Sequence, residues 1–217
     1  MGSFAIIPAA PVLLHDIDRS ETSRTAELRS AIEDVLRRRP DWALPIEALP
    51  PVAGLGGLGI DRGIEARTGL RLDGQAWVEA VNALSAADRE TSEKAHPGVA
   101  VAYLHADAAG VRLGPLGSSE NLLIPIDLSV AASEDAPLAP VPGAAEAEEK
   151  LIAALRAGDP RGVLQAAATG HEVHADLTLL ESAARQLLES DTDFGGFDVV
   201  FDVDLHEVRS LCAAGTY

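Results

Sequence analysis

The sequence predicts an α/β fold: a single-domain sandwich of residues 1–217 in which helices flank a central mixed or mainly parallel sheet. Three observations predict it. Apolar runs of strand length alternate with segments whose apolar residues recur at helical spacing. The 217 residues are enough for one α/β domain with a large core, but few for two. No internal repeat or domain boundary interrupts the pattern.

The first half of the chain alternates between the two patterns. Pro8 and Pro11 end the first strand, and Pro40 ends the first helix behind three arginines that suit its dipole. Pro45 makes the second strand an edge or a short segment. The expected elements are a strand at 4–7, a helix from about 21 to 39, a strand within 43–49, a Pro- and Gly-rich loop at 50–63, a helix at 75–85 and a strand at 98–104.

The second half is expected to continue in the same way. Gly158 and Pro160 close one helix, and Pro160 opens a short one. Asp176 is placed to cap the last helix. The expected elements are turns or a hairpin at 110–119, a strand at 122–128, an acidic Pro-rich loop at 131–143, a helix at 144–157, a helix from 176 to 189 and a final strand at 197–205.

Charge and composition exclude several classes of partner. The net charge of −17 would repel a phosphate backbone or an anionic membrane surface, so neither nucleic acid nor membrane is expected. No run approaches the roughly 18 apolar residues of a membrane span. The start lacks a basic region and is interrupted by prolines, unlike a signal peptide. With Cys212 as its only cysteine, the chain forms no internal disulfide, and we expect a cytoplasmic protein.

Three motifs, in order, resemble those of a known family. Residues 7–14 read IPAAPVLL after the first strand, residues 127–130 read DLSV after a central strand, and residues 153–160 read AALRAGDP. Together they resemble the subunit-B-like relatives of the class III extradiol ring-cleavage dioxygenases, in particular their actinobacterial branch. The resemblance implies the α/β scaffold, a cleft at the motifs and, because these enzymes often work as multi-subunit complexes, a homo-oligomer.

The motifs lack the residues that the family's chemistry requires. Its enzymes hold non-haem Fe(II) with two histidines and a glutamate, and use a further histidine as acid or base. Here the opening histidine position falls on Ala10 and the acid–base position on Val130, while residues 50–63 contain no histidine. The resemblance therefore implies a non-catalytic protein with no cofactor and with a vestigial cleft for a small molecule or protein partner. We expect that cleft at Ala10, Pro11, His15, Asp127, Ser129 and Val130.

An alternative is a divergent metalloenzyme with relocated ligands, using Fe(II) if it is an extradiol-type dioxygenase. In the final strand Phe197, Val199, Phe201, Val203 and Leu205 would share one face, because side chains alternate along a strand. Asp198, Asp202, Asp204 and His206 would share the other. The candidate ligands are His15, Asp204 and His206. The same pattern also fits an edge strand with one solvated face, whose charges block edge pairing.

Other motifs are weaker evidence for a functional site. Residues 54–59, GLGGLG, satisfy a phosphate-binding pattern, but two prolines precede them and no helix is expected to follow. His171 and His174 have the spacing of a metal pair, although a solvated turn fits them better. No G-x-S-x-G elbow supports a serine hydrolase. Cys212 is expected to be a small apolar residue rather than a nucleophile. A third reading, compatible with the first, is a structural or regulatory subunit of a homo-oligomer.

Overall fold

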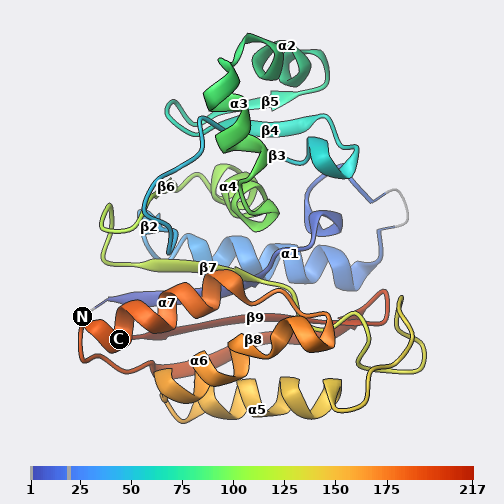
Figure 1. Ribbon diagram of the computed structural model, residues 1–217, viewed down its shortest axis with the longest axis vertical. Coiled ribbons are helices and arrows are strands. Elements are labelled where there is room, and N and C mark those ends of the chain that lie inside the picture. The colour runs from blue at the N-terminus through green and yellow to red at the C-terminus, as the bar shows by residue number, and fades with distance from the viewer. Residues whose placement is uncertain (1, 19–20) are drawn as a thin grey trace.

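The computed structural model describes residues 2–18 and 21–217 and confirms the mixed α/β single-domain fold. Its centre is a six-stranded sheet in the order β6-β2-β7-β1-β9-β8 (Figure 1). Strands β6, β2, β7 and β1 are parallel, and β9 runs antiparallel to both of its neighbours. The bounds are β1 Ser3–Pro8, β2 Asp41–Ala43, β6 Arg112–Gly114, β7 Leu122–Ile126, β8 Gly195–Leu205 and β9 Val208–Thr216.

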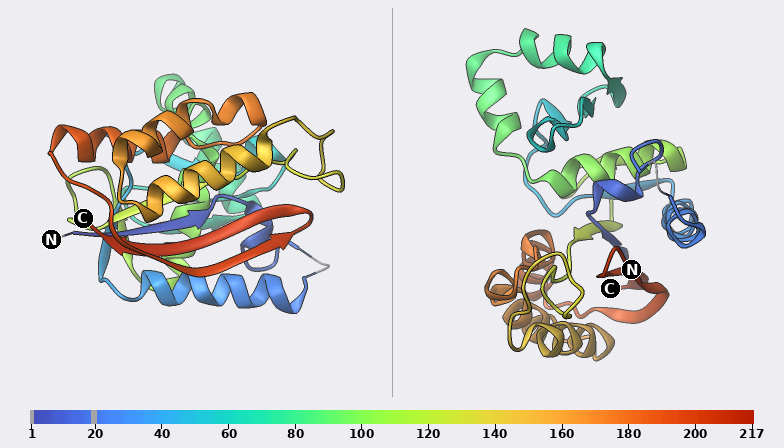
Figure 2. Two further views of the ribbon diagram at one scale, coloured as in Figure 1. Left: turned by 90° about the horizontal axis from the view of Figure 1, so that it is seen from below. Right: turned by 90° about the vertical axis from the view of Figure 1, so that its right-hand side faces the viewer.

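Helices cover both faces of this sheet (Figures 1 and 2). Helices α1, Ser23–Leu36, and α4, Pro97–Ala109, pack on one face. Helices α5, Ala144–Arg156, α6, Pro160–Ala168, and α7, Thr178–Glu189, pack on the other. Strand β1 shows the consequence: Ala5 and Ile7 belong to the α1–α4 core, and Phe4 and Ile6 belong to the α5–α7 core. A strand buried on both faces reads as a continuous apolar run, which is why its sequence was informative.

A small second sheet lies beyond α4, away from the central sheet (Figure 1). It has the order β3-β4-β5 and is antiparallel, with β3 Val52–Gly54, β4 Arg62–Glu65 and β5 Leu70–Asp73. Helices α2, Gln75–Ala83, and α3, Ala86–Glu93, complete this part, whose own small core is Val52, Leu72 and Trp77. The sequence predicted helix α2 but only a loop at 50–63, because these strands are too short to show a periodicity.

The strand predicted at residues 98–104 was wrong: this segment is helix α4. Pro97 stands in its first turn, the His96 side chain caps it, and Gly110 ends it with a φ of 71°. Residues 98–106 are all buried, so this helix shows no polar face. A short apolar run of this kind fits a buried strand or a buried helix equally well by periodicity. The proline and glycine at its ends were the signals that favoured a helix.

The C-terminal strands also differ from the prediction. Strand β8 lies at the edge of the sheet, as expected for the solvated alternative, but it pairs with β9, which was not predicted. A register shift at 199–201 reverses the alternation. Phe197 and Val199 therefore pack on the α5–α7 side, and Phe201 and Val203 pack on the α1–α4 side. The predicted single apolar face is thus wrong, and Asp198 does not share a face with Asp202 and Asp204.

Two shorter segments were also placed imperfectly. The possible hairpin at 110–119 is instead the parallel strand β6, which pairs with β2. The second strand ends at Ala43, so most of 43–49 is not strand. The other predicted helices agree with their ranges to within about three residues at each end. None of the helices in the described ranges has the length and apolarity to cross a membrane.

Candidate functional site

The candidate site lies where the chain leaves β1 and β7 in opposite directions. After β1 the chain continues into α1 on one face, and after β7 it continues into α5 to α7 on the other. Parallel neighbours of this kind leave a crevice at their carboxyl ends, where α/β proteins bind ligands. A cavity of about 780 Å³ opens there. One side of it is formed by residues from Pro8, at the end of β1, to Val12, and another side by residues from Ile126, at the end of β7, to Val130. We call it the switch-point cavity.

The structure brings four of the six predicted cleft residues to this cavity. Ala10, Pro11, Asp127 and Val130 line it. Ser129 does not line it, because its side chain is fully buried behind the wall. There its hydroxyl donates to the carbonyl of Val173 and accepts from the N–H of Ala131. Ser129 thus shapes the loop after β7. His15, the sixth residue, lies elsewhere.

The tip of the β8–β9 hairpin forms another wall. Only Ala213 to Thr216 of β9 pair with β1, so the earlier part of β9 projects past the carboxyl end of β1. This places His206, Val208 and Arg209 at the cavity. His206 and Glu207 form the two-residue turn with φ of 51° and 63°, a left-handed conformation that favours Asn-Gly. His206 Nε2 lies 3.4 Å from Asp18 Oδ2.

Arg209 contributes little free charge to the cavity. Its guanidinium donates to both carboxylate oxygens of Asp202, at 2.8 and 2.7 Å, and to Glu149 Oε1 at 2.6 Å. These carboxylates, Asp202 first, raise the pKa of Arg209. The guanidinium therefore ties the hairpin to helix α5 and is already neutralised by two acidic partners.

An acidic pair lies opposite this wall. Asp127 and Asp176 exchange two backbone hydrogen bonds, at 2.9 and 2.8 Å, and both line the cavity. His96 Nδ1 accepts from the N–H of Gly98 at 3.0 Å, so its proton is on Nε2. Nε2 then donates to Asp176 Oδ2 at 2.7 Å. Three loops far apart in sequence thus hold two carboxyl groups and an imidazole together.

The two carboxyl groups titrate at different pH. The hydrogen bond from His96 is the main cause that lowers the pKa of Asp176 to about 2. Burial, reinforced by the nearby charge of Asp176, raises the pKa of Asp127 to about 6. At neutral pH Asp176 is therefore an anion and Asp127 is close to its titration range. A carboxyl group with a raised pKa in a cavity is a common sign of a functional site.

Sequence reasoning missed the roles of several of these residues. It expected Asp176 only as a helix cap, and its Oδ1 does accept the N–H of Thr178 at 3.3 Å. His96 has no potential ligand beside it in the sequence. Its partner is 80 residues away, so no local signal could have found the pair. His171 and His174, expected in a solvated turn, are exposed as predicted, yet both border the cavity.

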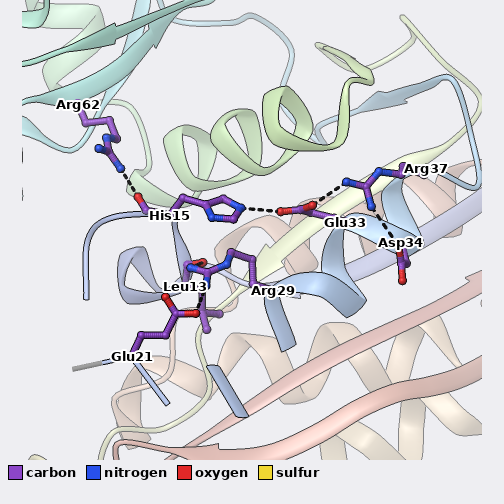
Figure 3. A network of polar contacts seen from close by, with 8 residues as sticks. All are labelled: Leu13, His15, Glu21, Arg29, Glu33, Asp34, Arg37 and Arg62. Carbon is purple, nitrogen blue, oxygen red and sulfur yellow. Dashed lines mark hydrogen bonds and ion pairs between the residues drawn. The ribbon is translucent and has the colours of Figure 1, made fainter. Parts of the chain in front are cut away.

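The proposed metal ligands do not converge. His15 Nε2 lies 3.0 Å from Glu33 Oε1 of helix α1, beside Arg37, and its carbonyl accepts from Arg62 (Figure 3). His206 lines the switch-point cavity, whereas His15 borders a separate small cavity with His105. Asp204 is an exposed residue of β8 opposite Arg209. Across residues 2–18 and 21–217, no three His, Cys, Asp or Glu side chains gather as metal ligands would.

Two glycines in and near GLGGLG have a packing role. A Cβ at Gly54 would lie 1.9 Å from the Trp77 ring, and one at Gly63 would lie 2.4 Å from it. The indole therefore needs these bare backbone surfaces. The segment continues into a three-residue 3-10 turn, Gly56–Leu58, and then β4, so no α-helix N-terminus meets a phosphate there. Cys212 is fully buried, and burial raises its pKa to about 12, which suits a core residue.

Taken together, the switch-point cavity has a mainly apolar wall with an acidic pair, and His171, His174 and His206 also line it. Prolines, leucines, valines and alanines form most of its wall, including Pro137 and Leu138 of the 131–143 loop. Asp127 and Asp176 form the acceptor end. We compared the chain with models of known protein families and with curated proteins, and neither comparison found a match.

Proposed function

We propose that the protein is a non-catalytic relative of the class III extradiol dioxygenases that binds a small molecule in the switch-point cavity. One observation carries the proposal: a cavity of about 780 Å³ lies at the carboxyl ends of two adjacent parallel strands. Ala10 and Val130 are in its wall, at the positions where the resemblance places histidines. Their side chains are hydrocarbon and can neither coordinate Fe(II) nor transfer a proton. The residues present therefore do not fit the family's iron site.

The polar end of the cavity indicates the ligand's chemistry. Asp176 is ionised and Asp127 titrates near neutral pH, so this end accepts hydrogen bonds and attracts cations. Arg209, the cation nearby, is already paired with Asp202 and Glu149. We infer a small, mainly apolar ligand with a hydroxyl or ammonium group. A ligand whose polar group is a carboxylate is disfavoured, because the acidic pair would repel it.

The test compares three single-ring probes by titration calorimetry: catechol, benzylamine and benzoate. We expect catechol and benzylamine to bind at least tenfold more tightly than benzoate. Val130→Phe, which fills the cavity, should abolish binding of both. Val78→Phe, on exposed helix α2, is the matched control and should leave binding unchanged. Equal affinity for benzoate, or binding that survives Val130→Phe, would contradict the proposed site.

The non-catalytic part needs its own test. Protein loaded anaerobically with Fe(II) is mixed with catechol and oxygen, and ring-cleavage product is followed by absorbance. We expect no product above an iron-only control. Turnover that disappears in His15→Ala or His206→Ala would instead establish the metalloenzyme with relocated ligands.

A homo-oligomer is compatible with this proposal. The aromatic content is only 4%, which leaves less contact area per core residue for the single chain. Light scattering after size exclusion gives the mass directly, and a monomer at all concentrations would remove the subunit reading without affecting the cavity.

A further inference from the structure

A second cavity, of about 710 Å³, lies in the part of the molecule formed by the small sheet and helices α2 and α3. It shares no lining residue with the switch-point cavity. We call it the Trp77 cavity. Its size falls within the range of roughly 300 to 1,000 Å³ that small-molecule sites occupy. The motif resemblance does not extend to it, because none of the three motifs contributes a lining residue.

Bare backbone forms its floor. Gly54 and Gly63 fix the Trp77 indole, which is only 8% exposed. Gly57 differs from them, since a Cβ there would meet nothing within 4 Å. Gly57 is also exposed, so the backbone beside the indole is open at this position. Val78 and Val81 of α2 and Leu84 add an apolar wall.

The polar groups of the cavity include unused donors. Within the described part of the chain, the Trp77 N–H has no hydrogen-bond acceptor. Arg89 uses Nη2 to donate to the carbonyl of Val81 at 3.1 Å, which leaves its other nitrogens available. Asp61 and Glu93 also line the cavity and oppose binding of an anion. The donors thus favour a carbonyl oxygen, and because the acids disfavour an anion while Arg89 disfavours a cation, the lining favours an uncharged ligand.

We propose that the Trp77 cavity binds a planar, uncharged heteroaromatic molecule that carries a ring carbonyl. The open backbone at Gly57 accepts the ring, the Trp77 N–H and Arg89 donate to its carbonyl, and the apolar wall of α2 covers its edge. A ligand without a hydrogen-bond acceptor would bury the indole N–H unsatisfied, so a ligand with a carbonyl group binds better. The site is independent of the switch-point cavity and of what that cavity binds.

Lumichrome, an uncharged tricyclic ring with two carbonyls, is the probe, and its fluorescence anisotropy reports binding. Gly57→Phe fills the open floor without displacing Trp77 and should weaken binding at least tenfold. Gly57→Ala, the matched control, should stay within threefold of the natural protein. Trp77→Phe keeps a ring but loses the N–H, and should weaken binding several-fold. Val130→Phe should have no effect.

Two results would overturn the proposal. One is lumichrome that does not bind, or that binds equally well to Gly57→Phe. The other is tighter binding of 1-naphthoate, an anionic two-ring probe without a ring carbonyl, in competition with lumichrome. Circular dichroism of each variant confirms that it is folded. If Trp77→Phe does not fold, the comparison of Gly57→Phe with Gly57→Ala still tests the proposal.

Discussion

Single residues at the switch-point cavity differ from what their type alone predicts. Asp127 and Asp176 are both aspartates, and their backbones are hydrogen-bonded to each other. Burial nevertheless raises the pKa of Asp127 to about 6, whereas His96 lowers the pKa of Asp176 to about 2. The buried His105 shows the same principle, since burial lowers its pKa to about 4. What decides each value is solvent access and partners, which a residue's neighbours in sequence do not reveal.

Asp127 makes a pH-dependent prediction. Its pKa is raised on folding, so the native state binds the proton more tightly and this group favours folding more as pH falls through 6 to 4. Above pH 6 the buried charge opposes folding by about 3 kcal/mol. Asp127→Asn should therefore be more stable than the natural protein at pH 7.5, with the difference vanishing near pH 4. Urea unfolding across this range measures it, with exposed Asp135→Asn as control. A difference independent of pH would contradict the burial of Asp127.

At the scale of elements, the β8–β9 hairpin combines strain with a position at the cavity. Its turn residues, His206 and Glu207, both adopt positive φ, which costs residues with side chains roughly 1–2 kcal/mol each. The bulge at 199–201 turns the outer strand so that Asp202 meets Arg209, whose other partner is on α5. Strained positions of this kind are common beside functional sites.

The turn predicts a stabilising substitution. Glu207→Gly removes the side chain from a left-handed position and should raise the free energy of unfolding by about 0.5–1 kcal/mol. That corresponds to a melting temperature higher by roughly 1–4 °C for a domain of this size. Glu207→Ala keeps a Cβ at the same position and should give no such gain. Equal effects of the two would show that charge, rather than backbone conformation, is responsible.

At the scale of the whole molecule, one hydrophobic core lies on each face of the central sheet, and a third lies in the small part beyond α4. The first two share the central strands, whereas Val52, Leu72 and Trp77 form a separate cluster. Helix α4 belongs to the main core while β3 packs on it, so the small sheet rests on the main body. Small clusters of this kind are where local opening begins.

Trp77 tests this arrangement. Trp77→Ala should remove about 3–5 kcal/mol of packing from the small sheet. We expect hydrogen exchange to accelerate at amides of 52–73 and to stay slow in β1 and β7. Val78→Ala, on the exposed side of the same helix, should change neither region. Equal acceleration in β1 would show that the small sheet and the central sheet open as one unit.

Elements with local signals could be predicted from the amino-acid sequence. The apolar run of β1, the helical stripes of α1, α5 and α7, and the proline and glycine boundaries around them were sufficient to predict the α/β class. The motifs also pointed to Ala10, Pro11, Asp127 and Val130, which the structure places around one cavity. Motifs that follow neighbouring parallel strands lie close together in space, because the carboxyl ends of such strands meet at one edge of the sheet.

Tertiary structure decided the rest. Burial on all sides made α4 look like a strand, and the partner strand made β8 bulge and reverse its faces. The pairing of His96 with Asp176 spans 80 residues, and the glycine at the start of GLGGLG, Gly54, is explained by the Trp77 indole that packs on it. Such contacts depend on which surfaces meet after folding, and no periodicity or local propensity along the chain encodes that information.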